Sequence, residues 1–201
     1  MRFGSLFTGI GMMDLGLEWA GMTCAWQVEI YDYCNRVLEA HWPNVKRYKD
    51  IRKVNGSELE PVDLLCGGLP CQPHSLAGKR QAGTDPRDLW PEFARIIREL
   101  RPRWVLAENV PGILSSDAGR FFGGILGDLA KSGYDAAWEV LPAAAFGAPH
   151  IRERVWIIAH TTNHTVLHHE LRESIPDNDT GGHGSFRVMA YANGNRLEAF
   201  R

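Results

Sequence analysis

The segment CGGLPCQPHS (66–75) places Cys71 between two prolines, Pro70 and Pro73, directly after an apolar run and two glycines. Each proline fixes its own φ and restricts the residue before it, so the peptide around Cys71 should be stiff, with its thiol displayed. A thiolate in such a position is a nucleophile when nearby positive charge or a helix terminus lowers its pKa. The remaining cysteines lie within strand or helix patterns, which predicts small buried side chains: Cys24, Cys34 and Cys66.

Two later segments carry side chains that could activate a substrate for this nucleophile. Glu108 ends an apolar strand pattern in AENV and could donate a proton or pair with a ring nitrogen; the alternative is a salt bridge to an arginine such as Arg103. In HIRERVW, Arg152 and Arg154 stand two residues apart at the predicted start of a strand, so both side chains should lie on one face. Arginines there could grip a carbonyl or a phosphate, or could belong to a solvated strand edge.

A third set of residues has the types that bind an adenosine-containing cofactor. FTGIG (7–11) predicts a glycine turn between a strand and a helix, where backbone can approach a nucleotide closely. Glu29 follows the second predicted strand and could accept hydrogen bonds from ribose hydroxyls. Asp50 follows the third and could hold an adenine amino group. The structural alternatives are a tight turn, a helix N-cap for Glu29 and a surface turn for Asp50.

The elements that must position these residues alternate between strand and helix up to residue 133, which predicts an α/β fold with a mostly parallel sheet. Ligands in such sheets bind beyond the carboxyl ends of the strands, where the residues above gather. A link of only about a dozen residues between the last two strands favours a late antiparallel pairing. The predicted strands are 2–8, 23–29, 48–51, 62–67, 103–109, 134–141 and 154–160, and the predicted helices are 12–21, 30–42, 88–101 and 119–133.

Bulk properties narrow the class of protein. The chain has 201 residues, 44% hydrophobic and 23% charged, which fits one large domain or one domain plus a tail. No apolar run could span a membrane and the first residues do not resemble a signal peptide, so we expect a cytoplasmic location. The net charge of −2 means that nucleic acid must be bound by a local basic face. We predict a catalytic domain over 1–160 and a polar tail or truncated remainder over 161–201.

Histidines near the end of the chain suggest a metal site, but their spacing fits no closed zinc site with cysteines. We therefore predict solvated side chains and no metal for His160, His164, His168, His169 and His183.

In this order, the motifs resemble those of the cytosine-C5 DNA methyltransferases over roughly residues 2–160. The proline-cysteine-glutamine block is highly specific, whereas the glycine turn alone is not. The resemblance implies a Rossmann-like methyltransferase fold. The matching segments are SLFTGIG for the cofactor-binding first motif, VE (28–29) for the ribose-binding acid, GGLPCQPHS for the catalytic Pro-Cys loop, and ENV and HIRERVW for the later glutamate and arginine motifs.

The resemblance implies that cytosine in double-stranded DNA is the substrate. Cys71 would be the nucleophile that attacks C6, and Glu108 would hold N3 and the exocyclic amine of the base. Arg154 would contact the base carbonyl, with Arg152 supporting the loop.

The cofactor implied is S-adenosylmethionine. Phe7 would lie against the adenine, Glu29 would bind the ribose and Asp50 would contact the adenine amino group. Ile30 stands where many members place an aromatic residue that stacks on adenine. The cofactor-binding set that the resemblance implies is completed by Gly9, Gly11, Ile51 and Pro70.

A base within a duplex is out of reach, so the target cytosine would have to be flipped out. The 74–87 loop, with Lys79, Arg80 and Arg87, could close over the phosphates and the base. The family normally adds a variable target recognition domain, which residues 161–201 are too few to form, so a separate chain could supply recognition. A phage or restriction-modification context would suit the family.

Other interpretations stay open at this point. The chain could be a truncated remnant that binds cofactor or DNA without turnover, or an RNA-directed member of the same family. An ordinary dinucleotide oxidoreductase is supported only by the glycine turn.

Overall fold

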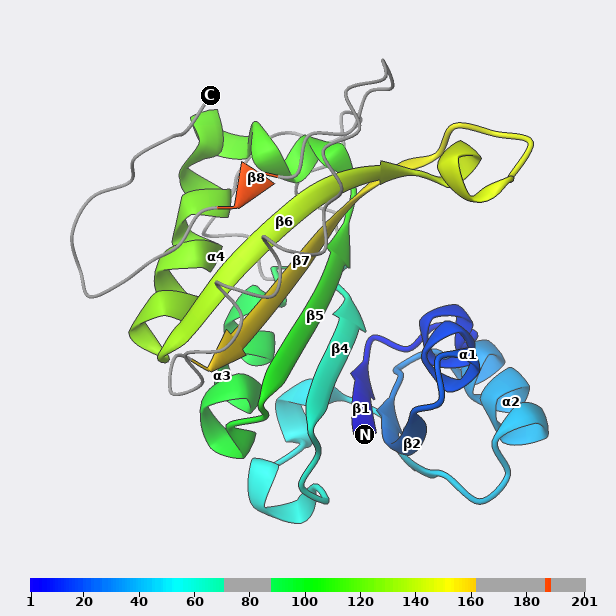
Figure 1. Cartoon of the computed structure of the whole chain (residues 1–201). Helices are drawn as coiled ribbons and strands as arrows, with labels where there is room; N and C mark the ends of the chain where they lie inside the picture. The colour runs from blue at the N-terminus through cyan, green and yellow to red at the C-terminus, as the bar shows by residue number, and fades with distance from the viewer. Residues whose placement is uncertain (71–87, 162–186, 189–201) are drawn as a thin grey trace.

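At the centre of the fold lies β1 (Arg2–Leu6), in which every residue from Phe3 to Leu6 is buried. Such continuous burial is typical of a parallel strand that is covered on both faces. The computed structural model describes residues 1–70, 88–161 and 187–188. Within them, eight strands form one sheet with helices on both sides (Figure 1).

The sheet has the strand order β3-β2-β1-β4-β5-β7-β6-β8. The pairs from β3 across to β5 are parallel, whereas β7 runs antiparallel to both β5 and β6. This arrangement confirms the predicted α/β fold, including the late antiparallel strand. The other strands are β2 (Thr23–Val28), β3 (Lys46–Tyr48), β4 (Leu64–Gly68), β5 (Trp104–Asn109), β6 (Tyr134–Pro142), β7 (Glu153–Thr161) and β8 (Arg187–Val188).

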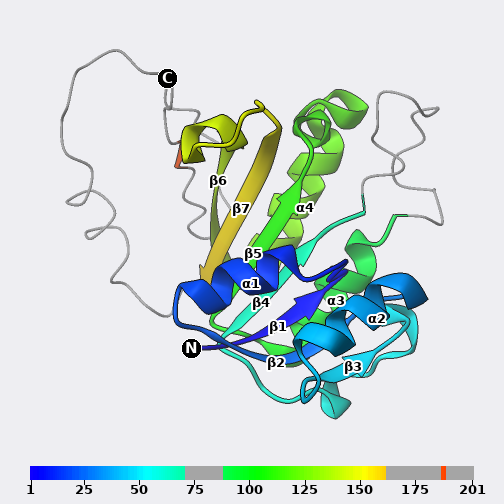
Figure 2. The same cartoon turned by 90° about the vertical axis from the view of Figure 1, so that its right-hand side faces the viewer.

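Helices cover the two faces of the sheet separately. On one face, α1 (Met12–Trp19) packs Met13 and Leu17 against a small cluster that includes Phe3 and Leu64. With the molecule turned by 90°, α1 is seen in front of the sheet (Figure 2). The main core, on the other face, buries the apolar sides of α3 (Trp90–Leu100) and α4 (Arg120–Lys131). The remaining helix, α2 (Asp32–His41), links β2 to β3.

The order of the strands reverses beside β1. The chain runs outward from β1 through β2 to β3, then returns to place β4 on the other side of β1. Connections that diverge in this way leave a crevice beyond the carboxyl ends of the two central strands. The ends of β1 and β4, at Leu6 and Gly68, therefore define where a ligand site is expected.

Several predicted boundaries differ from the structure for local reasons. The first strand stops at Leu6, because Phe7 adopts a left-handed conformation with φ of 53°. The third strand lies earlier than predicted, since residues from Ile51 onward form the 3₁₀ helix η1 (Ile51–Lys53). The last strand begins at Glu153, one residue before its predicted start, so Arg152, expected at the start of this strand, lies just outside it.

The end of the chain is described only in part. The strand β7 continues to Thr161, and β8 pairs with β6 through Val188 opposite Ala137. The predicted domain boundary at residue 160 stays a prediction, and the predicted 74–87 loop lies outside the described residues. Among the helices of the described part of the chain, none has both the length and the apolar character needed to cross a membrane.

We predict that Gly67→Ala destabilises the fold. A Cβ at this position would lie 2.6 Å from the carbonyl oxygen of Leu6 and 2.9 Å from the Phe93 ring, so β1 and β4 would have to separate. Urea unfolding should show a loss of about 1–3 kcal/mol. As a matched control, Gly16→Ala in α1 meets open space and should raise stability by about 0.5–1 kcal/mol. Equal stabilities for Gly67→Ala and the unmodified chain would contradict this packing.

Candidate functional site

A pocket of about 830 Å³ lies beyond the carboxyl ends of β1, β4 and β5. The hairpin between β6 and β7, with its short helix η5 (Ala143–Phe146), extends past these strand ends and forms the opposite wall (Figure 1). The pocket brings together residues that are distant in the sequence. Those that the sequence predicted and that line it are Phe7, Gly9, Glu108, Arg152 and Arg154.

Glu108 lies near the end of β5, directly beside the end of β4. It pairs with Gly68 in the parallel ladder, and a Cβ on Gly68 would come within 3.2 Å of Glu108 Oε2. The glycine therefore leaves the room that the carboxyl group occupies. The N–H of Leu69 donates to the carbonyl oxygen of Glu108 at 3.1 Å, which ties the peptide after β4 to the same point.

Arg154 reaches Glu108 from the neighbouring antiparallel strand. In the β5–β7 ladder Glu108 stands opposite Trp156, so Arg154, two residues earlier on β7, shares that face. Its Nε lies 2.8 Å from Glu108 Oε1, and each side chain is 23% exposed. The salt bridge that the sequence suggested as an alternative does form, but with Arg154 rather than with Arg103.

Burial dominates the electrostatics of Glu108. Desolvation raises the pKa of its carboxyl group, and the nearby charges of Arg154 and Arg152 lower it without cancelling that effect. The net result is a pKa above the ordinary value of a glutamate. A carboxyl group of this kind takes up a proton more readily than an exposed one, as an acid that serves a ring nitrogen requires.

Arg152 lines the same pocket although it precedes the strand. Its φ is 37°, a left-handed conformation that is rare for a residue with a side chain. Arg152 and Arg154 were expected to share a face because alternate residues of a strand do so, but Arg152 is not part of the strand. Both arginines still face Glu108 closely enough to lower its pKa, because the turn before β7 directs Arg152 into the pocket.

The glycine turn lies on the other side of the pocket. Gly9 and Gly11 have positive φ values of 59° and 85°. At Gly11 a Cβ would lie 2.4 Å from the Trp42 ring, so this position excludes larger residues. Glu29, only 5% exposed, holds the turn in place, because one carboxylate oxygen accepts the N–H of Gly9 at 2.7 Å and the other accepts that of Tyr31 at 2.8 Å.

A buried carboxyl group that the sequence reasoning missed also supports the turn. Asp14, fully buried in α1, accepts hydrogen bonds from Ser5 Oγ at 2.7 Å and Gln27 Nε2 at 2.8 Å. Burial raises the pKa of Asp14, and these hydrogen bonds oppose that rise. The interactions join the first turn of α1 to β1 and β2. An acid in the first turn of a mostly apolar helix was the signal in the sequence.

The other predicted cofactor residues are not among those that line the pocket. Ile30 is 50% exposed, and Asp50 caps η1 by accepting the N–H of Arg52 at 3.1 Å. Ile51 is 3% exposed and packs in the main core, whereas Pro70 is half-buried. Asp50 is therefore a turn residue, as the alternative interpretation expected, and its contact with an adenine amino group stays a prediction.

The turn and its surroundings fit the adenosine part of S-adenosylmethionine. A Cβ on Gly9 would meet nothing within 4 Å, so the space above the turn is open. The apolar side chains of Ile10 and Met12 are exposed at 45% and 67%, and the carboxylate of Glu29 lies next to the turn. Apolar surface beside an acid is what an adenine and a ribose require.

Other sequence predictions fall beyond the described residues. These include Cys71, the basic residues Lys79, Arg80 and Arg87, and His164, His168, His169 and His183. In the part of the chain that is described, no three His, Cys, Asp or Glu side chains gather as a metal site. Of the cysteines predicted to be buried, Cys24 and Cys66 are, whereas Cys34 is half-buried.

Sequence reasoning also missed two aromatic residues of the pocket. Phe146 lines it from η5 while remaining 75% exposed, and Trp156 lines it from β7. An aromatic residue isolated among alanines and glycine in a loop, as in AAAFGAP (143–149), was a usable signal for Phe146.

Comparisons with known proteins agree with this geometry. A family model described as C-5 cytosine-specific DNA methylase matches residues 1–192. The Type II methyltransferase M.BsuFI of Bacillus subtilis is 34% identical over 179 residues, which cover 89% of this chain and 44% of that protein. M.AquIA of Picosynechococcus sp. is also 34% identical, over 80% of this chain and 72% of that protein.

Solved structures give the same result. The crystal structure of a DNA modification methyltransferase encoded within an E. coli prophage superposes with a TM-score of 0.71 at 28% identity. The match covers 81% of this chain and 47% of that one. The chain spans about half the length of most of the curated relatives that it matches. Since the family model matches nearly the whole chain and curated relatives exceed 30% identity, this chain belongs to the C-5 cytosine-specific DNA methylase family.

Proposed function

We propose that this chain carries the catalytic site of a DNA methyltransferase that transfers a methyl group from S-adenosylmethionine to C5 of cytosine. The observation that carries the proposal is the half-buried carboxyl group of Glu108, held by Arg154 in the pocket at the end of β5. The N–H of Leu69 donates a hydrogen bond to the carbonyl oxygen of Glu108. The chain segment that leads to Cys71 therefore lies next to Glu108. Family membership supports the same reaction.

The chemistry explains why a thiol and an acid are needed together. Carbon C5 of cytosine is too electron-poor to take a methyl group unaided. In the proposed reaction, the thiolate of Cys71 forms a bond to C6, and the electron pair of the C5–C6 double bond makes C5 nucleophilic. After methylation, C5 loses its proton and the electron pair that returns expels the thiolate. Covalent catalysis of this kind divides one difficult step into easier ones.

Glu108 has the properties to polarise the ring while the thiolate adds. A carboxyl group with a raised pKa can hold a proton at N3 of the base, where negative charge develops. Its other oxygen can accept from the exocyclic amine. Arg154, already 2.8 Å from the carboxylate, would contact the base carbonyl and keep Glu108 oriented. Arg152, which lines the same pocket, would support the loop before β7.

The residues for the cofactor are those of the glycine turn and the strand ends beside it. When bound, S-adenosylmethionine supplies the electrophilic methyl group. Phe7, which stacks on Phe93 with 6.2 Å between ring centroids, would offer a flat surface to the adenine. Glu29 has lone pairs left on both carboxylate oxygens to accept from the ribose hydroxyls. Asp50 would accept from the adenine amino group.

The proposed substrate is double-stranded DNA with the target cytosine flipped into the pocket. A pocket of about 830 Å³ has room for one extruded base. Recognition of a target sequence is proposed to come from protein outside these 201 residues, either further along the same polypeptide or on a separate chain. The matches to curated relatives support this, because they leave about half of most of those proteins unpaired.

A trapping experiment tests the proposal. Incubating the chain with labelled S-adenosylmethionine and cytosine-containing duplex should transfer label to DNA. Duplex with 5-fluorocytosine should instead yield a covalent protein–DNA adduct, because fluorine at C5 blocks the elimination step. Cys71→Ser should abolish both. Cys34→Ser, which alters a half-buried thiol in α2, is the matched control and should retain both.

The outcomes separate the proposal from its alternatives. Cofactor binding without label transfer or adduct would indicate a binding protein without turnover. Transfer to RNA but not to DNA would indicate an RNA-directed enzyme. Binding of a nicotinamide cofactor in place of S-adenosylmethionine would overturn the family-based assignment of the cofactor.

Glu108→Gln should reduce methyl transfer by roughly 100-fold or more while leaving affinity for S-adenosylmethionine nearly unchanged, since the residue acts on the base. Single-turnover rates and binding isotherms on the same samples would measure both. An equal loss in rate and in cofactor affinity would show that Glu108 is structural.

The pKa of Glu108 gives an independent prediction. Arg154→Met removes a charge that opposes the effect of burial, so the pKa of Glu108 should rise further. Because the pKa of Glu108 is higher in the folded chain than in the unfolded chain, protonation of this carboxyl group stabilises the fold. This stabilisation is complete below the unfolded pKa of about 4.3 and is lost as the pH rises through the folded pKa. Carbon NMR titration of labelled glutamate would measure the pKa of Glu108 in the unmodified chain and in Arg154→Met, and Glu108→Gln would assign the signal. An unchanged pKa in Arg154→Met would contradict the assigned electrostatics.

A further inference from the structure

The strand that leads to Asp50 is poorly held by the sheet. Among the described residues, the three-residue strand β3 (Lys46–Tyr48) pairs only with β2 and forms an edge of the sheet. Short edge strands are among the less stable parts of a fold. Asp50 lies two residues past its end, so backbone pairing alone does not fix where its carboxylate points.

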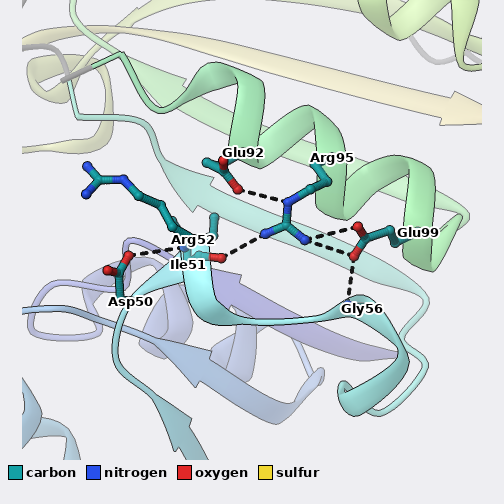
Figure 3. A network of polar contacts seen from close by, with 7 residues as sticks. All are labelled: Asp50, Ile51, Arg52, Gly56, Glu92, Arg95 and Glu99. Carbon is teal, nitrogen blue, oxygen red and sulfur yellow. Dashed lines mark hydrogen bonds and ion pairs between the residues drawn. The ribbon is translucent and has the colours of Figure 1, made fainter. Parts of the chain in front are cut away.

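Two charged residues of α3 hold the segment that follows (Figure 3). Arg95 donates from one terminal nitrogen to the carbonyl oxygen of Ile51 at 2.8 Å. Glu99 accepts the N–H of Gly56 at 2.7 Å. These two contacts grip the chain immediately after Asp50 and again five residues later. We call Arg95 and Glu99, with the two backbone groups they bind, the α3 clamp.

The clamp is internally braced. The second terminal nitrogen of Arg95 donates to both carboxylate oxygens of Glu99, at 3.0 Å each, and its Nε donates to Glu92 at 2.8 Å. All three groups of the guanidinium are therefore engaged, and the side chain is 27% exposed. Charge-assisted hydrogen bonds in such a fork fix geometry as well as adding stability. The rigid guanidinium transmits the position of α3 to the backbone of Ile51.

The segment is also fitted closely to α3. A Cβ on Gly56 would lie 2.5 Å from the Cβ of Glu99, so glycine is required for this approach. The side chains of Ile51 and Val54 are buried in the same core as Ile96 of α3. Asp50 Oδ1 accepts a hydrogen bond from the N–H of Arg52, and this bond caps the 3₁₀ helix η1. The other carboxylate oxygen has the capacity to accept from a ligand.

We infer that Arg95 is a positioning residue for cofactor selectivity: through Ile51 it holds Asp50 where its carboxylate reads the amino group of adenine. The inference rests on the proposed function. It adds a residue on a helix remote in sequence from the cofactor motifs, for which none of the sequence motifs gave a signal. The expected consequence is discrimination between adenine, which carries an amino group at C6, and hypoxanthine, which carries a carbonyl oxygen there.

Calorimetry with two probes tests this on the full chain. S-adenosylhomocysteine and S-inosylhomocysteine differ only in the base, at C6 and in the proton that hypoxanthine carries on the adjacent N1. The unmodified chain should prefer the adenosyl compound, and Asp50→Asn should lose most of the preference. Arg95→Met should weaken binding of the adenosyl compound about tenfold, equivalent to about 1.4 kcal/mol, and leave binding of the inosyl compound nearly unchanged. Arg95→Lys, which keeps the charge but not the fork, should recover part of the preference.

Arg98→Met is the matched control, because Arg98 is an exposed arginine on the same helix. This variant should prefer the adenosyl compound over the inosyl compound as strongly as the unmodified chain does. The ratio of two dissociation constants from one sample does not depend on the fraction of folded protein, so partial unfolding of Arg95→Met would not imitate the result. Failure of the unmodified chain to bind either probe would overturn the proposed cofactor and this inference together. A full preference in Arg95→Met, with the preference lost in Asp50→Asn, would overturn the clamp alone.

Discussion

The site depends on a carboxyl group that is kept partly out of water while an arginine faces it. Burial alone would leave Glu108 neutral over a wide pH range, and Arg154 alone would leave it a simple ion pair. The structure combines the two, with burial the stronger. Such a group can hold or release a proton at modest cost, and the surrounding fold is arranged so that both partners meet at one strand end.

Three features of the backbone bring that meeting about. The reversal of strand order beside β1 opens the crevice, Gly68 leaves room for the carboxyl group, and the antiparallel β7 brings Arg154 across from Glu108. The antiparallel strand matters most, because in a fully parallel sheet the start of the neighbouring strand would lie at the opposite edge. The hairpin before β7 then lines the pocket with Phe146 and Arg152.

Much of this could be predicted from the sequence, because it is local. Alternating apolar segments gave the strands and helices, and a short link gave the antiparallel pairing of β6 with β7. Residues at strand ends, such as Glu108 and Gly9, were predicted to gather because topology alone places them at one edge. Side-chain partners were harder: the pairing of Glu108 with Arg154 depends on ladder register, and the left-handed Arg152 depends on a turn that no residue type announces. The α3 clamp joins helix α3 to a loop 40 or so residues earlier, and only the packed structure reveals it.

In the proposed reaction, Cys71 and Glu108 act on opposite sides of one extruded cytosine. A crystal structure of the chain with S-adenosylhomocysteine and duplex DNA containing 5-fluorocytosine tests it most directly. We expect continuous density from the sulfur of Cys71 to C6 of the flipped base, with the carboxyl group of Glu108 within hydrogen-bonding distance of N3. A covalent bond from another residue, or a bound base whose N3 faces away from Glu108, would contradict it.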